Sequence, residues 1–295
     1  MTIQHPEDVT PAVLEVMQRT RDPRLREIMV SLVQHLHAFV RDVRLTEAEL
    51  RDAAAMLAQL GQQTTDSHNE VILMAGSLGV SILVCLLNNG NRGASETSQS
   101  LLGPFWRMHS PRVANGGSIV RSATPGEPLY VNARVVDRAG KPIAGAEVDV
   151  WHSSPVGLYE VQDPTQADMN LRGKFMTDTD GRFWFSTVKM AGYPVPTSGV
   201  VGQLLRAQDR HPYRPAHLHA LIVKPGYKTL ISQVYDREDR YIDSDVQFGV
   251  TRATTGDYVR HEEPHPSGAA GPWYSLDYTY VMEPGEAVLP RPPIK

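Results

Sequence analysis

The sequence predicts an α+β chain in which a helical N-terminal unit precedes an antiparallel β-sandwich. Through the first hundred residues, apolar side chains recur at three- and four-residue steps, as they do on one face of a helix. Beyond residue 90, glycine and proline become frequent, and apolar residues alternate with polar ones as in half-buried strands. The 295 residues also suit two domains of ordinary size. We therefore place a helical dimerisation unit at residues 1–104 and the β-sandwich domain at residues 105–295.

Signals for helix starts support the N-terminal unit. Asp22 precedes Pro23, a pair that suits an N-cap followed by the first helical position. Thr46 and Glu49 have the spacing of a capping box, in which each side chain bonds the backbone N–H of the other residue. The almost wholly apolar segment 71–87 is shorter than the ~20 residues that a membrane span needs. We interpret it as a fully buried helix, and the whole unit as one that packs against itself or against a second copy.

The later part of the chain is predicted to form short strands joined by turns. Asp180 and Gly181 are typical hairpin-turn residues, and residues 139–142 give a second turn signal. No helical pattern separates the strand candidates, so we expect antiparallel neighbours rather than the parallel strands of a βαβ fold. The strand candidates are residues 129–135, 148–150, 182–186, 218–223 and 230–235.

Charge and cysteine content exclude several kinds of protein. Lys and Arg number 29 against 33 Asp and Glu, a formal net charge of −4, and no basic stripe stands out, so we expect no nucleic-acid partner. The single cysteine, Cys85, excludes a disulfide framework and a thiolate metal cluster. The first residues lack the basic and apolar regions of a secretory signal. We expect a cytoplasmic protein that does not insert into membranes.

The most informative local pattern is His217-Leu218-His219. On a strand, residues two apart project from the same face, so these two imidazoles can reach one metal ion. The pattern also suits two surface histidines on an exposed sheet face. If a carboxylate such as Asp236 joined them, the metal would be zinc or ferrous iron.

Two tyrosines in turns rich in glycine and proline offer a different ligand. Tyr159 follows Gly157-Leu158, and Tyr193 lies within Gly192-Tyr193-Pro194. A free phenol has a pKa of ~10, so only a strong Lewis acid deprotonates it near neutral pH. Two tyrosinates together with two histidines would select ferric iron by charge and hardness. A buried tyrosine that ligates nothing is the alternative at each position.

Several segments together carry a resemblance to a known family. They include Leu-Gly-Pro-Phe at residues 102–105, Thr-Asp-Gly-Arg-Phe at 179–183 and Arg-Pro-Ala-His-Leu-His at 214–219, with further matches at residues 140–151 and 192–194. On these motifs the chain resembles, over nearly its whole length, the intradiol ring-cleaving dioxygenases, catechol 1,2-dioxygenase and its relatives. The stretch from residue 202 to residue 217 is most similar to the hydroxyquinol 1,2-dioxygenase branch.

The resemblance implies an iron enzyme with two substrates, a small aromatic diol or triol and O2. In the family, the diol chelates the ferric iron, and the tyrosinate at the position of Tyr193 is displaced and accepts a proton. The iron ligands implied for the one Fe(III) of each subunit are Tyr159, Tyr193, His217 and His219.

Two further residues take roles by the same resemblance. Arg214 would stabilise the negative charge that builds on the substrate during attack by oxygen. A surface guanidinium at a sheet edge is its alternative. Gln233 would hydrogen-bond groups derived from oxygen, or else only fill a strand position.

The implied substrate pocket departs from the hydroxyquinol pattern at two positions. That branch tends to carry an acidic residue where Gly76 stands and a small apolar residue where Gln247 stands. We hypothesise that Gln247 takes over the polar contact to a third ring hydroxyl, while Gly76 leaves room for a ring substituent. The pocket residues implied by the resemblance are Leu73, Gly76, Gly103, Pro104, Phe105, Val195, Arg214 and Gln247.

The implied reaction opens hydroxyquinol (benzene-1,2,4-triol) between adjacent hydroxylated carbons and places both atoms of O2 in the product. The product is 3-hydroxy-cis,cis-muconate, which tautomerises to maleylacetate. Catechol, chlorocatechol or another substituted catechol is the alternative substrate, and a transthyretin-like binding module, which residues 136–150 also resemble, is the non-enzymatic alternative. In the family, the helical parts of two subunits form a homodimer with an apolar tunnel that can hold lipid.

Overall fold

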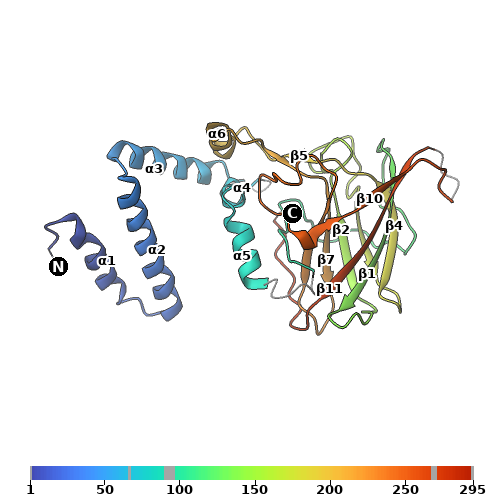
Figure 1. Ribbon diagram of the computed structural model, residues 1–295, viewed down its shortest axis with the longest axis horizontal. Coiled ribbons are helices and arrows are strands. Elements are labelled where there is room, and N and C mark those ends of the chain that lie inside the picture. The colour runs from blue at the N-terminus through green and yellow to red at the C-terminus, as the bar shows by residue number, and fades with distance from the viewer. Residues whose placement is uncertain (1, 66–67, 90–96, 267–270, 294–295) are drawn as a thin grey trace. The chain divides into compact units, whose positions relative to one another are not determined.

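The computed structural model describes residues 2–65, 68–89, 97–266 and 271–293 (Figure 1). The chain divides into two compact units, Met1–Gln59 and Leu60–Lys295. Helices form the first unit, and both large sheets belong to the second. The boundary between the compact units therefore lies before residue 104. The boundary at residue 104 between a dimerisation unit and a catalytic domain stays a prediction.

Local capping signals start the N-terminal helices where the sequence predicts. The Asp22 carboxylate accepts from the backbone N–H of Arg24 at 2.8 Å and of Leu25 at 3.1 Å. The capping box also forms, because Thr46 N donates to Glu49 Oε2 at 2.8 Å and Glu49 N donates to Thr46 Oγ1 at 3.3 Å. The helices are α1 (Val9–Met17), α2 (Pro23–Val43) and α3 (Glu47–Gln62).

One side of α2 is apolar and open to solvent. The repeat of three and four residues that predicted this helix forms a stripe of large apolar side chains with exposed fractions between 41% and 52%. A stripe of this kind is typical of a surface that a partner covers. Its members are Leu25, Ile28, Leu32, Leu36, Phe39, Val40 and Val43.

The apolar segment 71–87 is not the single, fully buried helix that we expected. It forms α4 (Glu70–Ser77) and α5 (Val80–Asn89), which meet at a bend of 75°. Gly79 causes the break, since its φ of +73° is left-handed and cannot continue an α-helix. Several large apolar side chains are exposed, Leu87 among them at 72%. Within the described residues, no single helix is both long and apolar enough to cross a membrane, and α4 and α5 reach that length and composition only as a bent pair.

A β-sandwich fills the second unit. Its strands are β1 (Pro128–Asp137), β2 (Glu147–Trp151), β3 (Arg172–Met176), β4 (Arg182–Val188), β7 (His217–Val223), β8 (Leu230–Asp236), β9 (Thr255–Gly256), β10 (Tyr258–His261) and β11 (Trp273–Met282). The order is β3-β2-β7-β8-β9 in one sheet and β10-β11-β1-β4 in the other. Both sheets contribute to one apolar core, which includes Val148 and Phe175 from the first and Phe183 and Tyr280 from the second.

The sandwich is mixed rather than wholly antiparallel, which corrects our expectation. β1 pairs antiparallel with β4 but parallel with β11, and β8 pairs parallel with β9. β1 and β11 are far apart in the sequence, so no hairpin imposes an antiparallel direction on them. All five strand candidates fall within β1, β2, β4, β7 and β8, whereas β11 was not predicted.

A helix lies between the strands where none was predicted. α6 (Val200–Ala207) follows Gly199, which has no side chain with which to cap it. Instead, Glu70 Oε1 accepts from Val201 N at 2.8 Å, and Gln63 Oε1 accepts from Val200 N at 3.0 Å. A β-carbon at Gly199 would lie 2.3 Å from Glu70 Oε1, so only glycine lets the cap approach. Because the cap comes from 131 residues away, no local pattern could reveal this helix.

Candidate metal centre

The structure brings together the four side chains that the sequence singled out for a metal ion. The phenol oxygens of Tyr159 and Tyr193 lie 3.5 Å apart. The ring centroids of Tyr193 and His217 are 5.5 Å apart, and those of His217 and His219 are 4.8 Å apart. All four side chains are buried. Two imidazoles and two phenols therefore converge on one place in the second unit.

The sheet register places both histidines on one face. His217 and His219 lie two residues apart on β7, and the short distance between their rings confirms that they share a face, as predicted. On the neighbouring strand β8, Tyr235 is opposite His217 and Gln233 is opposite His219. On the other side, Trp151 of β2 is opposite His219 and stacks on its ring at 4.6 Å.

The two tyrosines come from segments outside the large sheets. Tyr193 begins β5 (Tyr193–Pro194), which pairs with β6 (Tyr213–Arg214) so that Tyr193 lies opposite Arg214. Tyr159 lies in the connection between β2 and β3, and its ring stacks on Phe105 with centroids 4.3 Å apart. Their convergence with the histidines therefore depends on how the loops fold over the sheet.

Both imidazoles are neutral, and each has a nitrogen without a partner. His217 Nδ1 lies 2.7 Å from the carbonyl oxygen of Pro215, so Nδ1 carries the proton and the lone pair is on Nε2. Burial lowers the pKa of His217 to about 3 and that of His219 well below its ordinary value. His217 Nε2 and His219 Nδ1 are buried without a hydrogen-bond partner. Such nitrogens are rare in folded proteins, and a bound metal ion is one way to satisfy them.

The phenols favour a strongly acidic metal ion. Burial raises the pKa of Tyr159 well above its ordinary value. Burial also raises the pKa of Tyr193, although the positive charge of Arg214 partly offsets this increase. Without a bound cation, both phenols stay protonated at neutral pH. A cation that displaces their protons must be a strong Lewis acid, so two neutral imidazoles with two phenols fit ferric iron better than zinc or ferrous iron.

Asp236 does not join the two histidines. It follows Tyr235 on β8 and therefore projects from the opposite face of the sheet, where its Oδ2 pairs with Lys189 Nζ at 2.7 Å. In the part of the chain that the structure describes, no group of three or more His, Cys, Asp or Glu side chains could hold a metal ion. The reading with a carboxylate ligand from Asp236 therefore finds no support in the geometry.

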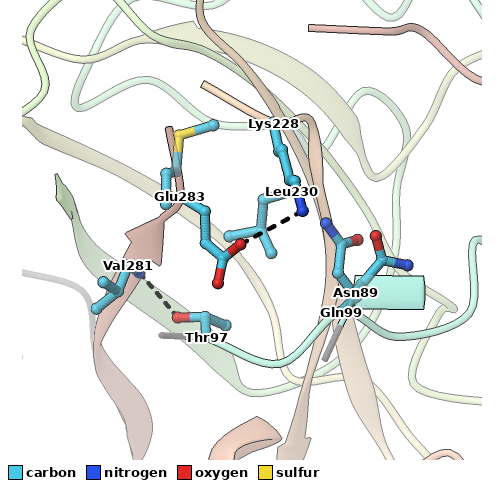
Figure 2. A pocket seen from close by; sticks show the side chains of 8 residues that line it. Asn89, Thr97, Gln99, Lys228, Leu230, Val281 and Glu283 are labelled. Carbon is cyan, nitrogen blue, oxygen red and sulfur yellow. Dashed lines mark hydrogen bonds and ion pairs between the residues drawn. The ribbon is translucent and has the colours of Figure 1, made fainter. Parts of the chain in front are cut away.

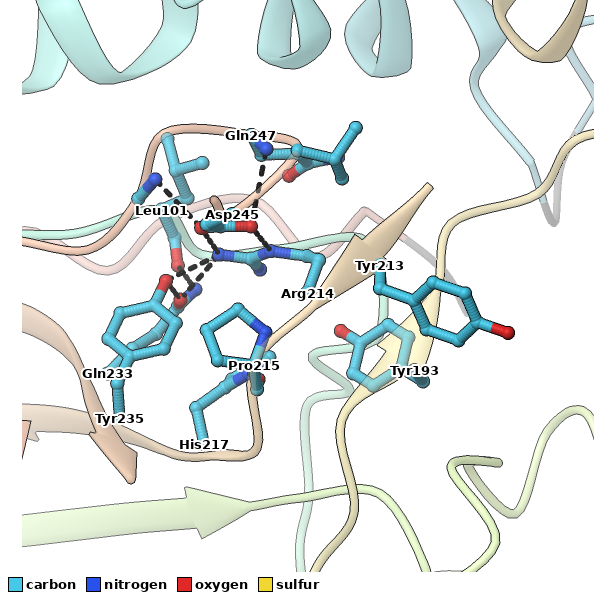
Figure 3. Close-up of polar contacts among 12 residues, drawn as sticks. Leu101, Tyr193, Tyr213, Arg214, Pro215, His217, Gln233, Tyr235, Asp245 and Gln247 are labelled. Atoms are coloured by element: carbon cyan, nitrogen blue, oxygen red, sulfur yellow. Dashed lines mark hydrogen bonds and ion pairs between the residues drawn. The ribbon is translucent and has the colours of Figure 1, made fainter. Parts of the chain in front are cut away.

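Arg214 is a buried charge rather than a guanidinium at the surface (Figure 3). Its Nε and Nη2 donate to the two carboxylate oxygens of Asp245, each at 3.0 Å. Nη2 also donates to Gln233 Oε1 at 3.0 Å and to the hydroxyl of Tyr235. Gln233 in turn donates from Nε2 to the carbonyl oxygen of Leu101 at 2.6 Å. These bonds fix one positive charge in the β6 position that faces Tyr193.

Asp245 is a residue of this centre that the sequence did not indicate. Besides its pair with Arg214, its carboxylate accepts from the backbone N–H of Gln247 at 3.2 Å and of Gly249 at 2.8 Å. It therefore holds the arginine and the loop that carries Gln247 at once (Figure 3). The pair spans 31 residues and has no motif of its own, so only the folded chain reveals it.

Besides Arg214, the predicted pocket residues Phe105 and Gly103 lie against the four clustered side chains. Phe105 stacks on Tyr159, as described above. Gly103 has a φ of +74°, and a β-carbon there would lie 3.2 Å from Cε1 of His219. Glycine at this position therefore lets the backbone approach the imidazole closely.

Gly76 and Gln247 occupy the same corner. A β-carbon at Gly76 would lie 3.1 Å from Cδ of Gln247, with the amide nitrogen and oxygen close behind. The space that we expected Gly76 to leave for a ring substituent is thus filled by the Gln247 side chain, which corrects that expectation. The small residue at 76 is what allows the longer one at 247.

Three predicted pocket residues, Leu73, Val195 and Pro104, differ in burial. Leu73 is buried on α4, one turn before Gly76. Val195 is buried, and its backbone N–H donates to the Pro212 carbonyl at 2.9 Å. Pro104 is exposed. Their roles in a pocket remain predictions.

A small cavity elsewhere in the second unit is not a substrate site (Figure 2). It encloses about 20 Å³, which suits about one water molecule. Polar groups on its wall are already paired, since Lys228 Nζ lies 3.5 Å from Glu283 Oε2 and Val281 N donates to Thr97 Oγ1 at 2.8 Å. An aromatic ring does not fit there.

Comparison with known protein families agrees with this geometry. The family model described as "Dioxygenase" matches residues 103–281, and the one described as "Catechol dioxygenase N terminus" matches residues 22–96. The chain belongs to the intradiol ring-cleavage dioxygenases, a family of oxidoreductases that depend on non-haem iron and use O2 to open aromatic diols or triols. This membership excludes a transthyretin-like binding module.

Individual relatives match along most of the chain. The sequence is 41% identical to a hydroxyquinol 1,2-dioxygenase of Rhizobium sp. (strain MTP-10005), over 92% of either chain. It is 40% identical to a 6-chlorohydroxyquinol 1,2-dioxygenase of Cupriavidus pinatubonensis, over 94% of this chain and 97% of the relative. Among solved structures, a hydroxyquinol 1,2-dioxygenase from Pseudomonas putida DLL-E4 superposes with a TM-score of 0.87 at 36% identity, covering 95% of this chain and 99% of the other.

His152 is a further buried histidine that plays no part in the cluster. Its Nδ1 lies 2.7 Å from the Ser153 carbonyl and so carries the proton, which leaves Nε2 to accept from Thr187 Oγ1 at 2.7 Å. Burial lowers its pKa from 6.5 to about 4. The folded protein therefore favours the neutral ring. The neutral His152 contributes its full stabilisation above pH 6.5, and this stabilisation is lost as the pH falls toward 4.

We expect His152→Gln to remove this pH dependence. The shift corresponds to about 3 kcal/mol in the free energy of unfolding. Urea unfolding of both proteins across this range should show that the stability advantage of the wild type shrinks by about that amount as the medium becomes acidic. Burial raises the pKa of Asp149 to about 6, which gives the opposite slope, but this contribution is common to both proteins and cancels in their difference. A constant difference across the range would show that His152 is not held neutral.

Proposed function

We propose that the chain is a non-haem Fe(III) enzyme that opens hydroxyquinol between adjacent hydroxylated carbons, giving 3-hydroxy-cis,cis-muconate and hence maleylacetate. The observation that carries the proposal is the buried cluster of two imidazoles and two phenols, in which two imidazole nitrogens lack partners. The names of the most similar relatives support the substrate. The proposed ligands of the one iron in each subunit are Tyr159, Tyr193, His217 and His219.

Ferric iron bound to these side chains supplies the Lewis acidity that lets a chelating diol lose its protons and makes its ring reactive toward O2. The chain provides the proton acceptor. Tyr193 would take this part, as the family resemblance implies, and it lies opposite the buried guanidinium of Arg214. Tyr159, covered on one face by Phe105, would be the second phenol that holds the ion.

The Arg214 cluster stabilises charge on the substrate. The guanidinium is already desolvated and oriented by Asp245, so it does not have to reorganise as negative charge develops nearby. Gln233 bonds the same guanidinium and faces His219 across the sheet, which suits it to bond an oxygen of the substrate or of O2. Both are proposed catalytic residues, together with Tyr193.

A substituted catechol, such as chlorocatechol, or catechol itself is the second candidate substrate. The pair formed by Gly76 and Gln247 favours this reading, since it replaces the acidic and apolar residues of the hydroxyquinol pattern. The amide of Gln247 can both donate and accept, so it suits a third ring hydroxyl as well. The proposed pocket comprises Leu73, Gly76, Gly103, Pro104, Phe105, Val195, Arg214 and Gln247.

We also propose that residues 1–104 form the dimerisation unit and residues 105–295 the catalytic domain. The exposed apolar stripe on α2 supports this assignment, because pairing with a second copy would remove it from water. The proposed assembly is a homodimer, with apolar surface suited to a lipid chain.

Oxygen uptake by the purified, iron-loaded protein tests the function. We expect uptake of one O2 per hydroxyquinol consumed, at a higher rate than with catechol or chlorocatechols. The product should be maleylacetate rather than the product of ring cleavage beside the diol. A higher kcat/KM for catechol or for a chlorocatechol would transfer the assignment to the second candidate. Absence of uptake with every diol, in protein shown to contain iron, would contradict the function itself.

The Gln247→Val substitution tests the pocket. Loss of the polar contact should lower kcat/KM for hydroxyquinol by roughly 10- to 100-fold relative to catechol, because a site built for a hydroxyl discriminates strongly. The ratio of the two substrates in the same preparation corrects for any general loss of activity. An unchanged ratio would remove Gln247 from the specificity determinants.

Substitution of a proposed ligand should change colour and metal content. Ferric tyrosinate absorbs visible light, so Tyr159→Phe should lose much of the colour, and His219→Ala should lose iron measured by elemental analysis. Tyr213→Phe is the matched control, since Tyr213 stacks on Tyr241 and lies outside the cluster. Full iron in His219→Ala, or full colour in Tyr159→Phe, would remove that residue from the ligand set.

A further inference from the structure

A buried ion pair lies directly beside Tyr159. Glu160, the next residue, has a side chain only 3% exposed. Its carboxylate accepts from Arg172 Nε at 2.6 Å and from Arg172 Nη2 at 2.8 Å, and Arg107 Nη1 adds a bond of 3.0 Å. Two guanidinium groups thus hold the main chain next to the tyrosine through one carboxylate.

Arg172 makes a third bond that reaches the other side of the same tyrosine. Its Nη1 donates to the carbonyl oxygen of Phe105 at 2.6 Å. The Phe105 ring is the one that stacks on Tyr159. A single buried guanidinium therefore holds both the residue that follows Tyr159 and the residue that covers its ring.

The sheet register connects Arg172 to the histidine side of the cluster as well. Arg172 on β3 is opposite Trp151 on β2, and Trp151 is opposite His219 on β7. The three residues form one row across the sheet, and the indole stacks on the imidazole. Arg172 is 1% exposed, so its orientation depends on these protein contacts rather than on water.

We propose that Arg172 is a positioning residue that fixes the phenol of Tyr159 in the orientation in which it binds the metal. The proposal rests on the proposed function, in which Tyr159 is a ligand of ferric iron. Tyr193 lies in a strand of two residues, opposite Arg214. Held in this way through both Glu160 and Phe105, Tyr159 would be the tyrosine better suited to remain a ligand when a substrate binds.

The role depends on the shape of the guanidinium and not only on its charge. Three nitrogens of Arg172 point to two acceptors, Glu160 and the Phe105 carbonyl, in a planar arrangement. A lysine ammonium keeps the charge but cannot span both acceptors in this way. Arg107 is a matched comparison, because it bonds the same carboxylate without reaching Phe105.

The test compares Arg172→Lys with Arg107→Lys in the iron-loaded protein. We expect both variants to keep their iron, since the four proposed ligands remain. In Arg172→Lys, the visible tyrosinate-to-iron absorption band should shift and broaden, and kcat should fall roughly tenfold with KM little changed, as for a misoriented group. In Arg107→Lys, the band should match the wild type. A purely structural role would lower the melting temperature in both variants and leave both bands unchanged.

The outcomes separate this proposal from the proposed function. If the wild type binds iron with a tyrosinate band and folded Arg172→Lys shows the same band and kcat, the role of Arg172 is wrong while the iron site stands. If the wild type itself has iron but no such band, the ligand assignment fails first. If Arg172→Lys does not fold, Glu160→Gln replaces it as the test. This substitution weakens the bonds between Arg172 and residue 160 and should shift the absorption band in the same direction. An unshifted band in Glu160→Gln would overturn the proposal.

Discussion

Exclusion of water is the constraint on which this centre depends. Each polar group in it must be satisfied by another part of the chain, because an unpaired buried charge costs several kcal/mol. Arg214 meets this requirement through Asp245, Gln233 and Tyr235. One nitrogen of each imidazole, Nε2 of His217 and Nδ1 of His219, has no partner, and burial lowers the pKa of both rings. The same exclusion of water that makes the arginine depend on these partners thus leaves two imidazole nitrogens without one.

The register of the strands determines which side chains meet in this buried centre. Four residues on neighbouring strands form one row across the sheet: Arg172 on β3, Trp151 on β2, His219 on β7 and Gln233 on β8. This row places the proposed positioning residue, a stacked indole, a proposed ligand and a hydrogen-bonding amide on one face. A one-residue slip between any two strands would move part of this set to the other face. The loops then add Tyr159 and Tyr193, which the sheet alone could not supply.

The proposed determinants of substrate choice lie in a different part of the second unit. Gly76 belongs to α4, whereas Gln247 belongs to the loop held by Asp245, and the two meet only after folding. Glu70 on the same helix caps α6, so α4 is tied to the segment that follows Val195. Changes in this corner can alter specificity without touching the four clustered side chains, which is consistent with one family acting on several aromatic diols.

Local chemistry determined much of the chain by itself. Asp22 and the pair of Thr46 and Glu49 start helices because their caps lie within three residues. The alternation in β1 and β2 is visible because successive residues of a strand point to opposite faces. The motif of His217 and His219 predicts a shared face for the same reason. Only the tertiary structure decided the parallel pairing of β1 with β11, the cap of α6, the pair of Arg214 with Asp245 and the bond from Arg172 to the Phe105 carbonyl. These features join residues tens to more than a hundred positions apart, and no periodic pattern records which distant groups must satisfy each other once water is excluded.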